Sequence, residues 1–202
     1  LAQQTALLRL ACDNMRAAGV PQINAFRAGN YGANLDTCRA LADVGVPFDF
    51  SYNAAFSDWC KFDLPQPLFQ PAALCGVTEY PTSYFEDYPG HLRPAQLCAC
   101  SFREMQHALV QAWHSGWSYF VILSHSFELL QGRTSPGKCR VNRTALARME
   151  SLCRFLAQNN DRFQTVTCDS LDVMTPQHAP LGMTLRGAWT NTIARYCEQA
   201  WV

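Results

Sequence analysis

The chain has 202 residues, of which 49% are hydrophobic and 12% aromatic, so it can bury a large core and does not have the composition of a disordered protein. Its 16 basic and 16 acidic residues cancel, and no run of Lys or Arg occurs, so we expect no nucleic-acid partner. No apolar run approaches the ~20 residues that span a bilayer, so we predict a single domain over residues 1–202 without a membrane span in this segment.

Helix and strand patterns alternate from the N-terminus. The first helix pattern places Leu7, Leu10 and Met15 on one apolar face, and Gly19 and Gly45 close the two helices of this half. The predicted elements are a helix over Leu1–Ala18, a strand over Pro21–Phe26, a helix over Leu35–Val44 capped by Asn34, a strand over Pro47–Tyr52, a long loop over Ala54–Ala73 and a strand over Gly76–Tyr80.

The second half continues this alternation. Ser101 and Glu104 have the spacing of a capping box, which predicts the start of a helix. The apolar run Tyr119–Leu123 is typical of a buried strand. The predicted elements are a loop over residues 82–96, a helix from Ser101, a strand over Trp117–Leu123, a loop over Gly132–Lys138, a helix from Asn142 to about Gln158, a strand over Arg162–Thr167 and a helix over Leu185–Gln199.

Helix-sized connections between strands favour a parallel sheet. We count about five predicted strands, whereas a closed barrel normally needs about eight. The fold is therefore predicted to be α/β, with a sheet that is open or that lacks strands preceding Leu1. Because the chain starts inside a helix pattern, we expect a truncated N-terminus, and the localisation stays unknown.

Ten cysteines is a high number. They can form disulfides, or they can be small buried residues in a reducing compartment. Most lie singly inside helix or strand patterns, and a chain of this length does not need disulfides for stability, so we favour reduced cysteines and, with them, a cytoplasmic location. Cys98 and Cys100 are one residue apart and no second pair matches them, so no zinc ribbon is expected.

Two side chains at strand ends can carry chemistry. His125 follows the strongest apolar strand and can transfer a proton near neutral pH; the alternative is a core histidine bonded to a backbone carbonyl. Arg27 stands beside Gly29 at the end of another strand and can hold a carboxylate with two hydrogen bonds; the alternative is a surface salt bridge. Because sites in α/β folds collect at the carboxyl ends of strands, we expect both residues at one site.

Further candidates follow the strand at Pro47–Tyr52 and the long loop after it. Asp49 can orient a histidine, and Ser51 and Asn53 can bond a substrate or simply cap a turn. Asp58 and Trp59 lie in the aromatic loop, where an indole can bind a sugar ring or pack in the core. His107 and His114 lie seven residues apart on one helix without a third ligand, and we interpret them as surface or packing residues.

Three segments occur in a recognisable order: Phe26–Gly32, Gly45–Asn53 and Leu123–Ser126. The first is similar to the arginine motif of the NodB-homology polysaccharide deacetylases (carbohydrate esterase family four), with Ala28 and Gly29 where a proline is common. The second resembles the family's strand that carries an aspartate and a serine. The third resembles its last motif, in which leucine directly precedes histidine; here Ser124 intervenes. The resemblance covers about residues 10–175, and Asp58-Trp59 corresponds to the family's Asp-Trp motif.

The resemblance implies a distorted (β/α) barrel of about seven strands, of which this chain would hold about five. It implies a polysaccharide partner and a divalent metal, usually zinc, which one aspartate and two histidines bind in the family. A second aspartate is the base, and the reaction removes N-acetyl groups from amino sugars. By this resemblance His125 is the general acid, Arg27 holds the catalytic aspartate, and Asp49 or Asp58 supports His125. The substrate-binding residues would be Tyr52, Asn53, Asp58 and Trp59.

The family's Asp-Asp and His-x-x-x-His motifs have no counterpart in this sequence, so no metal ligand is assigned. We therefore expect an incomplete and inactive C-terminal part of a deacetylase, and whether the chain itself is an enzyme stays open. The alternative is a complete, non-catalytic relative that binds glycan through Tyr52, Trp59 and Tyr84. An unrelated α/β hydrolase is disfavoured because no Gly-x-Ser-x-Gly motif occurs.

Overall fold

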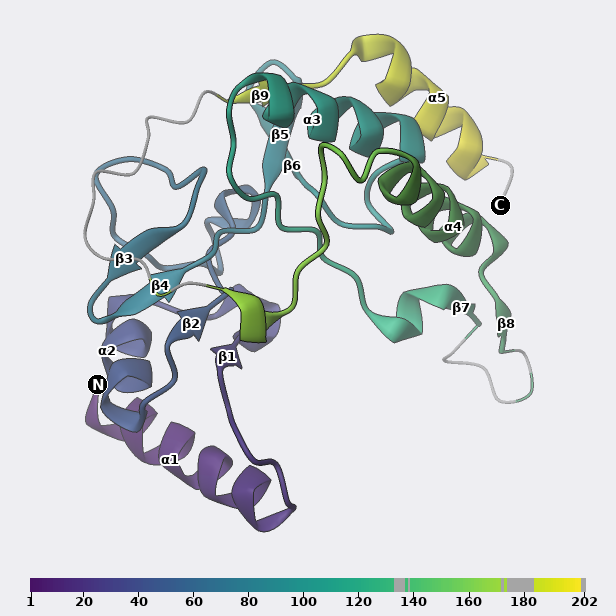
Figure 1. The fold of residues 1–202 in the computed structure, drawn as a ribbon. Coiled ribbons are helices and arrows are strands. Elements are labelled where there is room, and N and C mark those ends of the chain that lie inside the picture. The colour runs from purple at the N-terminus through teal and green to yellow at the C-terminus, as the bar shows by residue number, and fades with distance from the viewer. Residues whose placement is uncertain (133–136, 138, 172, 174–183, 201–202) are drawn as a thin grey trace. The chain divides into compact units, whose positions relative to one another are not determined.

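The computed structural model describes residues 1–132, 137, 139–171, 173 and 184–200, with the backbone alone at 199 and 200. These residues form a mixed α/β structure with five α-helices and small sheets, and no closed barrel occurs among them (Figure 1). They divide into two compact units. The first holds residues 1–82 and the described part of 166–182, and the second holds 83–165 with the described part of 183–202. The single domain over residues 1–202 stays a prediction.

The first unit contains a four-stranded sheet in the order β1-β2-β4-β3 (Figure 1). The strands β1 (Ala25–Phe26), β2 (Phe48–Asp49) and β4 (Val77–Glu79) are parallel, as predicted. The strand β3 (Ala72–Leu74) is antiparallel to β4 and was predicted as the end of a loop. Gly76 has φ +95° between them, a conformation that favours glycine in a tight turn. The three parallel strands place Phe26, Asp49 and Glu79 at one end of the sheet.

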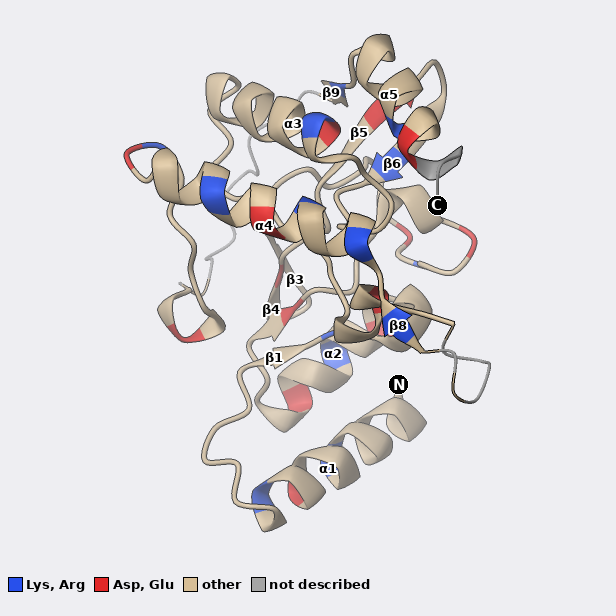
Figure 2. Ribbon diagram, turned by 90° about the vertical axis from the view of Figure 1, so that its right-hand side faces the viewer, with Lys and Arg blue, Asp and Glu red and all other residues tan. Residues whose placement is uncertain are grey.

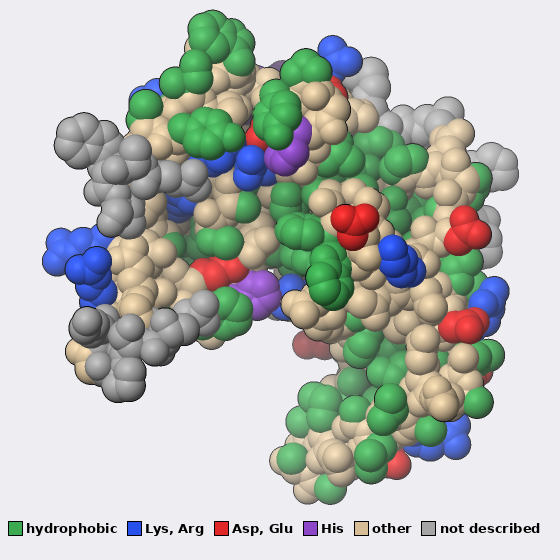
Figure 3. Space-filling view, turned by 180° about the vertical axis from the view of Figure 1, so that it is seen from behind, with side chains coloured by type: hydrophobic (Ala, Val, Ile, Leu, Met, Phe, Trp, Pro, Cys, Tyr) green, Lys and Arg blue, Asp and Glu red, His purple; other side chains and the backbone are tan. Residues whose placement is uncertain are grey.

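Two helices accompany this sheet and pack against each other. In α2 (Leu35–Val44) the Asn34 side chain accepts from the Thr37 N–H while Thr37 Oγ1 accepts from the Asn34 N–H, and Gly45 ends the helix in the left-handed region with φ +77°. The apolar face of α1 (Ala2–Ala17) is largely exposed. Leu7 is 67% exposed and Leu10 58%, so the helix carries hydrophobic side chains on its outer surface (Figure 3). Cys12 is the residue that α1 buries.

The second unit contains a three-stranded sheet in the order β6-β5-β9. Here the predicted loop over residues 82–96 is wrong, because β5 (Tyr84–Tyr88) and β6 (His91–Pro94) form an antiparallel hairpin. Asp87 interrupts the apolar pattern of β5, yet Arg93 of β6 binds its carboxylate, so a charged residue can lie inside this hairpin. The strand β9 (Leu185–Arg186) runs parallel to β5. The predicted helix start at Leu185 is therefore wrong, and the helix begins at Trp189. A small hairpin joins β7 (Leu130–Gln131) to β8 (Arg140–Val141).

Two predicted strands are absent from the described chain. Residues 117–122 form no ladder; Leu123 alone makes an isolated parallel bridge to Gln96. Residues 162–167 also lack a ladder, and Val166 is 43% exposed. An apolar, β-branched run reports a tendency to be extended and buried, whereas a strand also requires a neighbouring backbone in register. Most of the predicted loop over Gly132–Lys138 lies outside the described residues.

Three helices cover the second unit: α3 (Phe102–His114), α4 (Arg143–Gln158) and α5 (Trp189–Ala200). Ser101 and Glu104 form the predicted capping box of α3, and the Asn142 side chain accepts from the Ala145 N–H at the start of α4. The charged residues along α4 are three arginines and one glutamate, Glu150 (Figure 2). No helix within the described ranges is long and apolar enough to cross a membrane. The core of this unit contains Phe85, Leu97, Leu109, Leu152, Phe155 and Leu185.

Candidate functional site

The ends of β1 and β2 are joined through a side-chain hydrogen bond. Phe26 and Asp49 are register partners at the ends of these two parallel strands. Beyond them, the Ala28 N–H donates to Ser51 Oγ at 2.9 Å, and the Ser51 hydroxyl donates to Asp49 Oδ1 at 2.5 Å. Ser51 therefore links the loop that follows β1 to the carboxylate that ends β2. The structure brings together the arginine segment and the aspartate–serine segment, which the sequence separates by about twenty residues.

Arg27 lies in this loop and is exposed. It makes no salt bridge to any other described residue, so its guanidinium is available to an anion. A short 3-10 turn, η1 (Gly29–Tyr31), follows it, and Asn30 and Tyr31 there have φ values of 52° and 57°. Such values cost free energy in residues other than glycine. The Tyr31 ring stacks on Phe56 with 5.0 Å between ring centroids, a contact that helps to hold this strained turn.

Asp49 faces a second buried carboxyl group. Asp49 and Glu79 are register partners on β2 and β4, and both are 0% exposed. The Tyr52 N–H donates to Glu79 Oε1 at 2.9 Å, whereas no N–H or hydroxyl group of the described residues reaches Oε2. Glu79 is not among the site residues predicted from the sequence. Because the pattern gives no strand order, nothing in the sequence pairs it with Asp49.

The protonation of this carboxyl pair follows from its burial. Burial raises the pKa of both groups, and the adjacent Asp49 charge raises the pKa of Glu79 further, well above its ordinary range. Hydrogen bonds from Glu79 and Ser51 act in the opposite direction on Asp49, so its pKa rises less. The pKa of Glu79 is thus raised more than that of Asp49, so Glu79 is the group of this pair that keeps its proton to higher pH.

We tested whether the described residues fit the zinc site that the resemblance implies. Among them, Cys38, Asp49 and Glu79 are the one group of three or more possible ligands, with ligand atoms within 4.8 Å of one another. The group contains no histidine, and burial raises the pKa of the Cys38 thiol, which donates to Asp49 Oδ2 at 3.9 Å. Zinc requires deprotonated ligands, whereas burial raises the pKa of all three groups and opposes their deprotonation. These residues do not fit the family's Asp–His–His site.

The predicted substrate-binding residues fall into two sets. Tyr52 and Asn53 are buried: the Tyr52 hydroxyl accepts from the Leu68 N–H at 3.3 Å, and Asn53 Oδ1 caps the turn η2 (Ala54–Phe56) by accepting from Ala55 N–H at 3.1 Å. Asp58 and Trp59 are exposed, Trp59 by 61%. The geometry gives the first two residues a role in holding the loop, and their role in substrate binding stays a prediction.

His125 lies in the second unit, at the start of the 3-10 turn η3 (Ser126–Leu129). Its Nδ1 is 2.9 Å from Glu128 Oε1. The support for His125 therefore comes from Glu128, whereas Asp49, which was expected there, bonds Ser51 and Cys38. Sequence reading missed Glu128, although a carboxylate three residues after a histidine in a turn is the signal that could have found it. Since Arg27 and His125 belong to different units, their convergence on one site stays a prediction.

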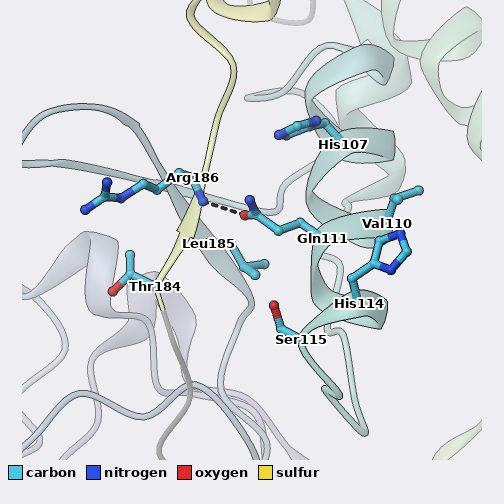
Figure 4. Close-up of a pocket in the computed structure, with 8 residues that line it drawn as sticks. All are labelled: His107, Val110, Gln111, His114, Ser115, Thr184, Leu185 and Arg186. Carbon is cyan, nitrogen blue, oxygen red and sulfur yellow. Dashed lines mark hydrogen bonds between the residues drawn. The ribbon is translucent and has the colours of Figure 1, made fainter.

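A separate cavity of about 750 Å³ lies between α3 and the segment that contains β9. His107 and Gln111 of α3, and Ser115 directly after it, lie on the side that faces this segment (Figure 4). Gln111 Oε1 accepts from the Arg186 N–H at 2.6 Å. His114 also lines the cavity. His107 and His114 therefore line the same cavity, whereas His125 does not line it.

Comparisons of this chain with protein-family models, with curated proteins and with solved structures gave no match.

Proposed function

We propose that this chain carries part of the active site of a hydrolase that removes N-acetyl groups from an amino-sugar polysaccharide. The observation that supports this proposal is the hydrogen-bonded path from Ala28 through Ser51 to Asp49. It joins the two segments that resemble the arginine and aspartate motifs of the deacetylases, at the carboxyl ends of neighbouring parallel strands. Sites of α/β proteins form at such ends.

Each residue then has a defined task. His125 is the general acid: with both ring nitrogens protonated, its Nε2 gives a proton to the amine nitrogen as the amide C–N bond breaks, which leaves the ring in its Nδ1–H form. A water molecule supplies the hydroxyl of the acetate, and the sugar leaves with a free amino group. Arg27 holds a carboxylate in the site through its exposed guanidinium. The described residues supply neither the family's metal ligands nor its base, and we derive no step through them.

The test is hydrolysis by the protein expressed from its own start codon, with N-acetylglucosamine tetramer as the probe. We expect equal amounts of acetate and free amino groups. His125→Ala should lower kcat by about 10²–10⁴-fold, the usual contribution of a general acid, while His114→Ala, an exposed histidine on α3, should leave kcat unchanged. A protein that releases no acetate from this probe contradicts the proposal.

A non-catalytic glycan-binding role is the second candidate. Trp59 supports it, because its indole is 61% exposed next to Asp58 in an aromatic loop, and an open aromatic face can stack on a sugar ring. Under this alternative the tetramer binds without acetate release, and Trp59→Ala abolishes the binding measured by titration calorimetry. The exposed Trp113 provides the matched control, since Trp113→Ala should bind as the unchanged chain does.

A further inference from the structure

The segment that ends in His125 is fixed by the loop before α3. The Leu123 N–H donates to the Ala95 carbonyl at 2.9 Å, and the Leu97 N–H donates to the Leu123 carbonyl at 2.9 Å. These two bonds form the isolated bridge between Gln96 and Leu123. They place Gln96 beside the turn that follows, so His125 starts η3 from a defined position.

Glu128 is held from three sides in that turn. Its Oε1 accepts from Gln96 Nε2 at 2.7 Å as well as lying 2.9 Å from His125 Nδ1. The Glu128 N–H donates to the His125 carbonyl at 2.9 Å, and Asn142 Nδ2 donates to the Glu128 carbonyl at 3.1 Å. The Glu128 side chain is 7% exposed, whereas that of His125 is 29% exposed. The buried carboxylate is therefore the fixed partner, and the imidazole is the one that reaches solvent.

The charge of Glu128 decides which nitrogen carries the proton. Burial alone would raise the pKa of Glu128, but the hydrogen bonds from His125 and Gln96 outweigh it and lower this pKa below its ordinary value. An ionised carboxylate only accepts hydrogen bonds, so Nδ1 of His125 must be the donor. The Phe127 ring stacks on the imidazole at 4.8 Å between centroids and 21° between planes, which also fixes the plane of the ring.

We propose that Glu128 is the positioning residue of His125: it keeps the imidazole in the Nδ1–H tautomer and leaves Nε2 as the nitrogen that meets the substrate. Glu128 thus takes the supporting role that the resemblance gives to an aspartate on another strand. The identity of the substrate rests on the proposed function, whereas the tautomer of His125 can be measured independently of that function. A residue that sets the tautomer of an acid–base histidine affects proton transfer, because the tautomer decides whether Nδ1 or Nε2 carries the proton.

The test is the tautomer of His125, read from the ¹⁵N shifts and ring proton couplings of the imidazole at about pH 9, above the ordinary titration range of histidine. The unchanged protein should show Nδ1–H with an unprotonated Nε2. Glu128→Ala should move the ring to the Nε2–H form, and Glu128→Gln, whose amide oxygen also accepts, should restore Nδ1–H. Glu150→Ala on the exposed side of α4 is the control and should change nothing.

An Nε2–H ring in the unchanged protein overturns the proposal, whether or not the Ala variant folds. An Nδ1–H ring that persists in a folded Glu128→Ala protein also overturns it. Acetate release then separates the two proposals. In an active protein, Glu128→Ala should lower kcat by about 10²-fold or more with little change in KM. Full activity of this variant would contradict the positioning role. A wild-type protein without activity contradicts the proposed function, and in that case the tautomer measurement alone tests the role of Glu128.

Discussion

Asp49 and Glu79 are register partners on neighbouring parallel strands, and both carboxyl groups lie entirely out of solvent. Two charges in this position would repel each other strongly, and burial raises the pKa of each group. A single shared proton removes this repulsion.

The shared proton predicts a stability that falls with rising pH. The pKa of Glu79 is higher in the folded protein than its ordinary value, so its favourable contribution is complete below about pH 4.5 and is lost as the pH rises through the folded pKa. Each unit of displacement corresponds to about 1.4 kcal/mol. Urea unfolding between pH 5 and pH 8 should show this loss. Glu79→Gln should remove most of it, because the amide cannot ionise.

The control for this experiment is Glu150→Gln on α4, which should retain the pH dependence of the unchanged chain. If Glu79→Gln retained the same dependence as this control, the proton would not be at Glu79.

The Ser51 bridge can be tested separately. Ser51→Ala leaves the partly buried Ala28 N–H without its partner and removes the hydroxyl bond to Asp49 Oδ1, which keeps only the bond from the N–H of residue 51, so the free energy of unfolding should fall by about 1–3 kcal/mol. Ser57→Ala changes an exposed serine of the next turn and should stay within about 0.5 kcal/mol of the unchanged chain. Equal effects of the two substitutions in urea titrations would show that the bridge contributes nothing.

The buried ion pairs of Arg195 in the second unit can be tested by substitution. This residue is 2% exposed, its Nη2 is 3.2 Å from Asp87 Oδ2, and its Nε donates to Glu104 Oε1 at 3.0 Å. Arg195→Ala leaves two buried carboxylates short of a partner and should cost about 3–5 kcal/mol in the free energy of unfolding.

Arg186→Ala provides the matched comparison, because that side chain is 79% exposed and its ion pair with Glu86 spans 3.7 Å; its cost should stay below about 1 kcal/mol. Two arginine variants of equal stability would contradict the ion pairs found for Arg195.

Thiol labelling tests the distribution of the cysteines. Partial desolvation of the Cys98 thiol, together with the nearby Glu128 carboxylate, raises the pKa of Cys98 to about 11. At pH 8 only a small fraction of this thiol is ionised, so Cys98 should react with iodoacetamide slowly although the residue is exposed. Exposed Cys75 should react faster, and buried Cys38 should react only after unfolding. Mass spectrometry of the labelled peptides measures all three, and a Cys98 rate equal to that of Cys75 would contradict this assignment.

The local signals of the sequence were sufficient for the starts of α2 and α3 and for the end of α2, but not for the start of α5, where β9 occupies Leu185–Arg186. Asn34 with Thr37 and Ser101 with Glu104 close their own hydrogen bonds within one turn, and Gly45 ends its helix by its own conformational freedom. Arg27 and His125 could be selected in the same way, since each follows an apolar run. The pairing of His125 with Glu128 spans three residues and was also within reach of the sequence.

The sequence by itself determined the capped ends of helices and which polar residues follow the apolar runs, because those features depend on neighbours within a few positions. Tertiary structure alone decided that residues 84–94 form a hairpin while the more apolar residues 117–122 form no ladder, since a strand needs a partner backbone from elsewhere in the chain. It likewise decided the protonation of Glu79 and the burial of Asp87, whose partner Arg195 is 108 residues away. Burial and the charge of distant neighbours set such properties, and no short pattern encodes either.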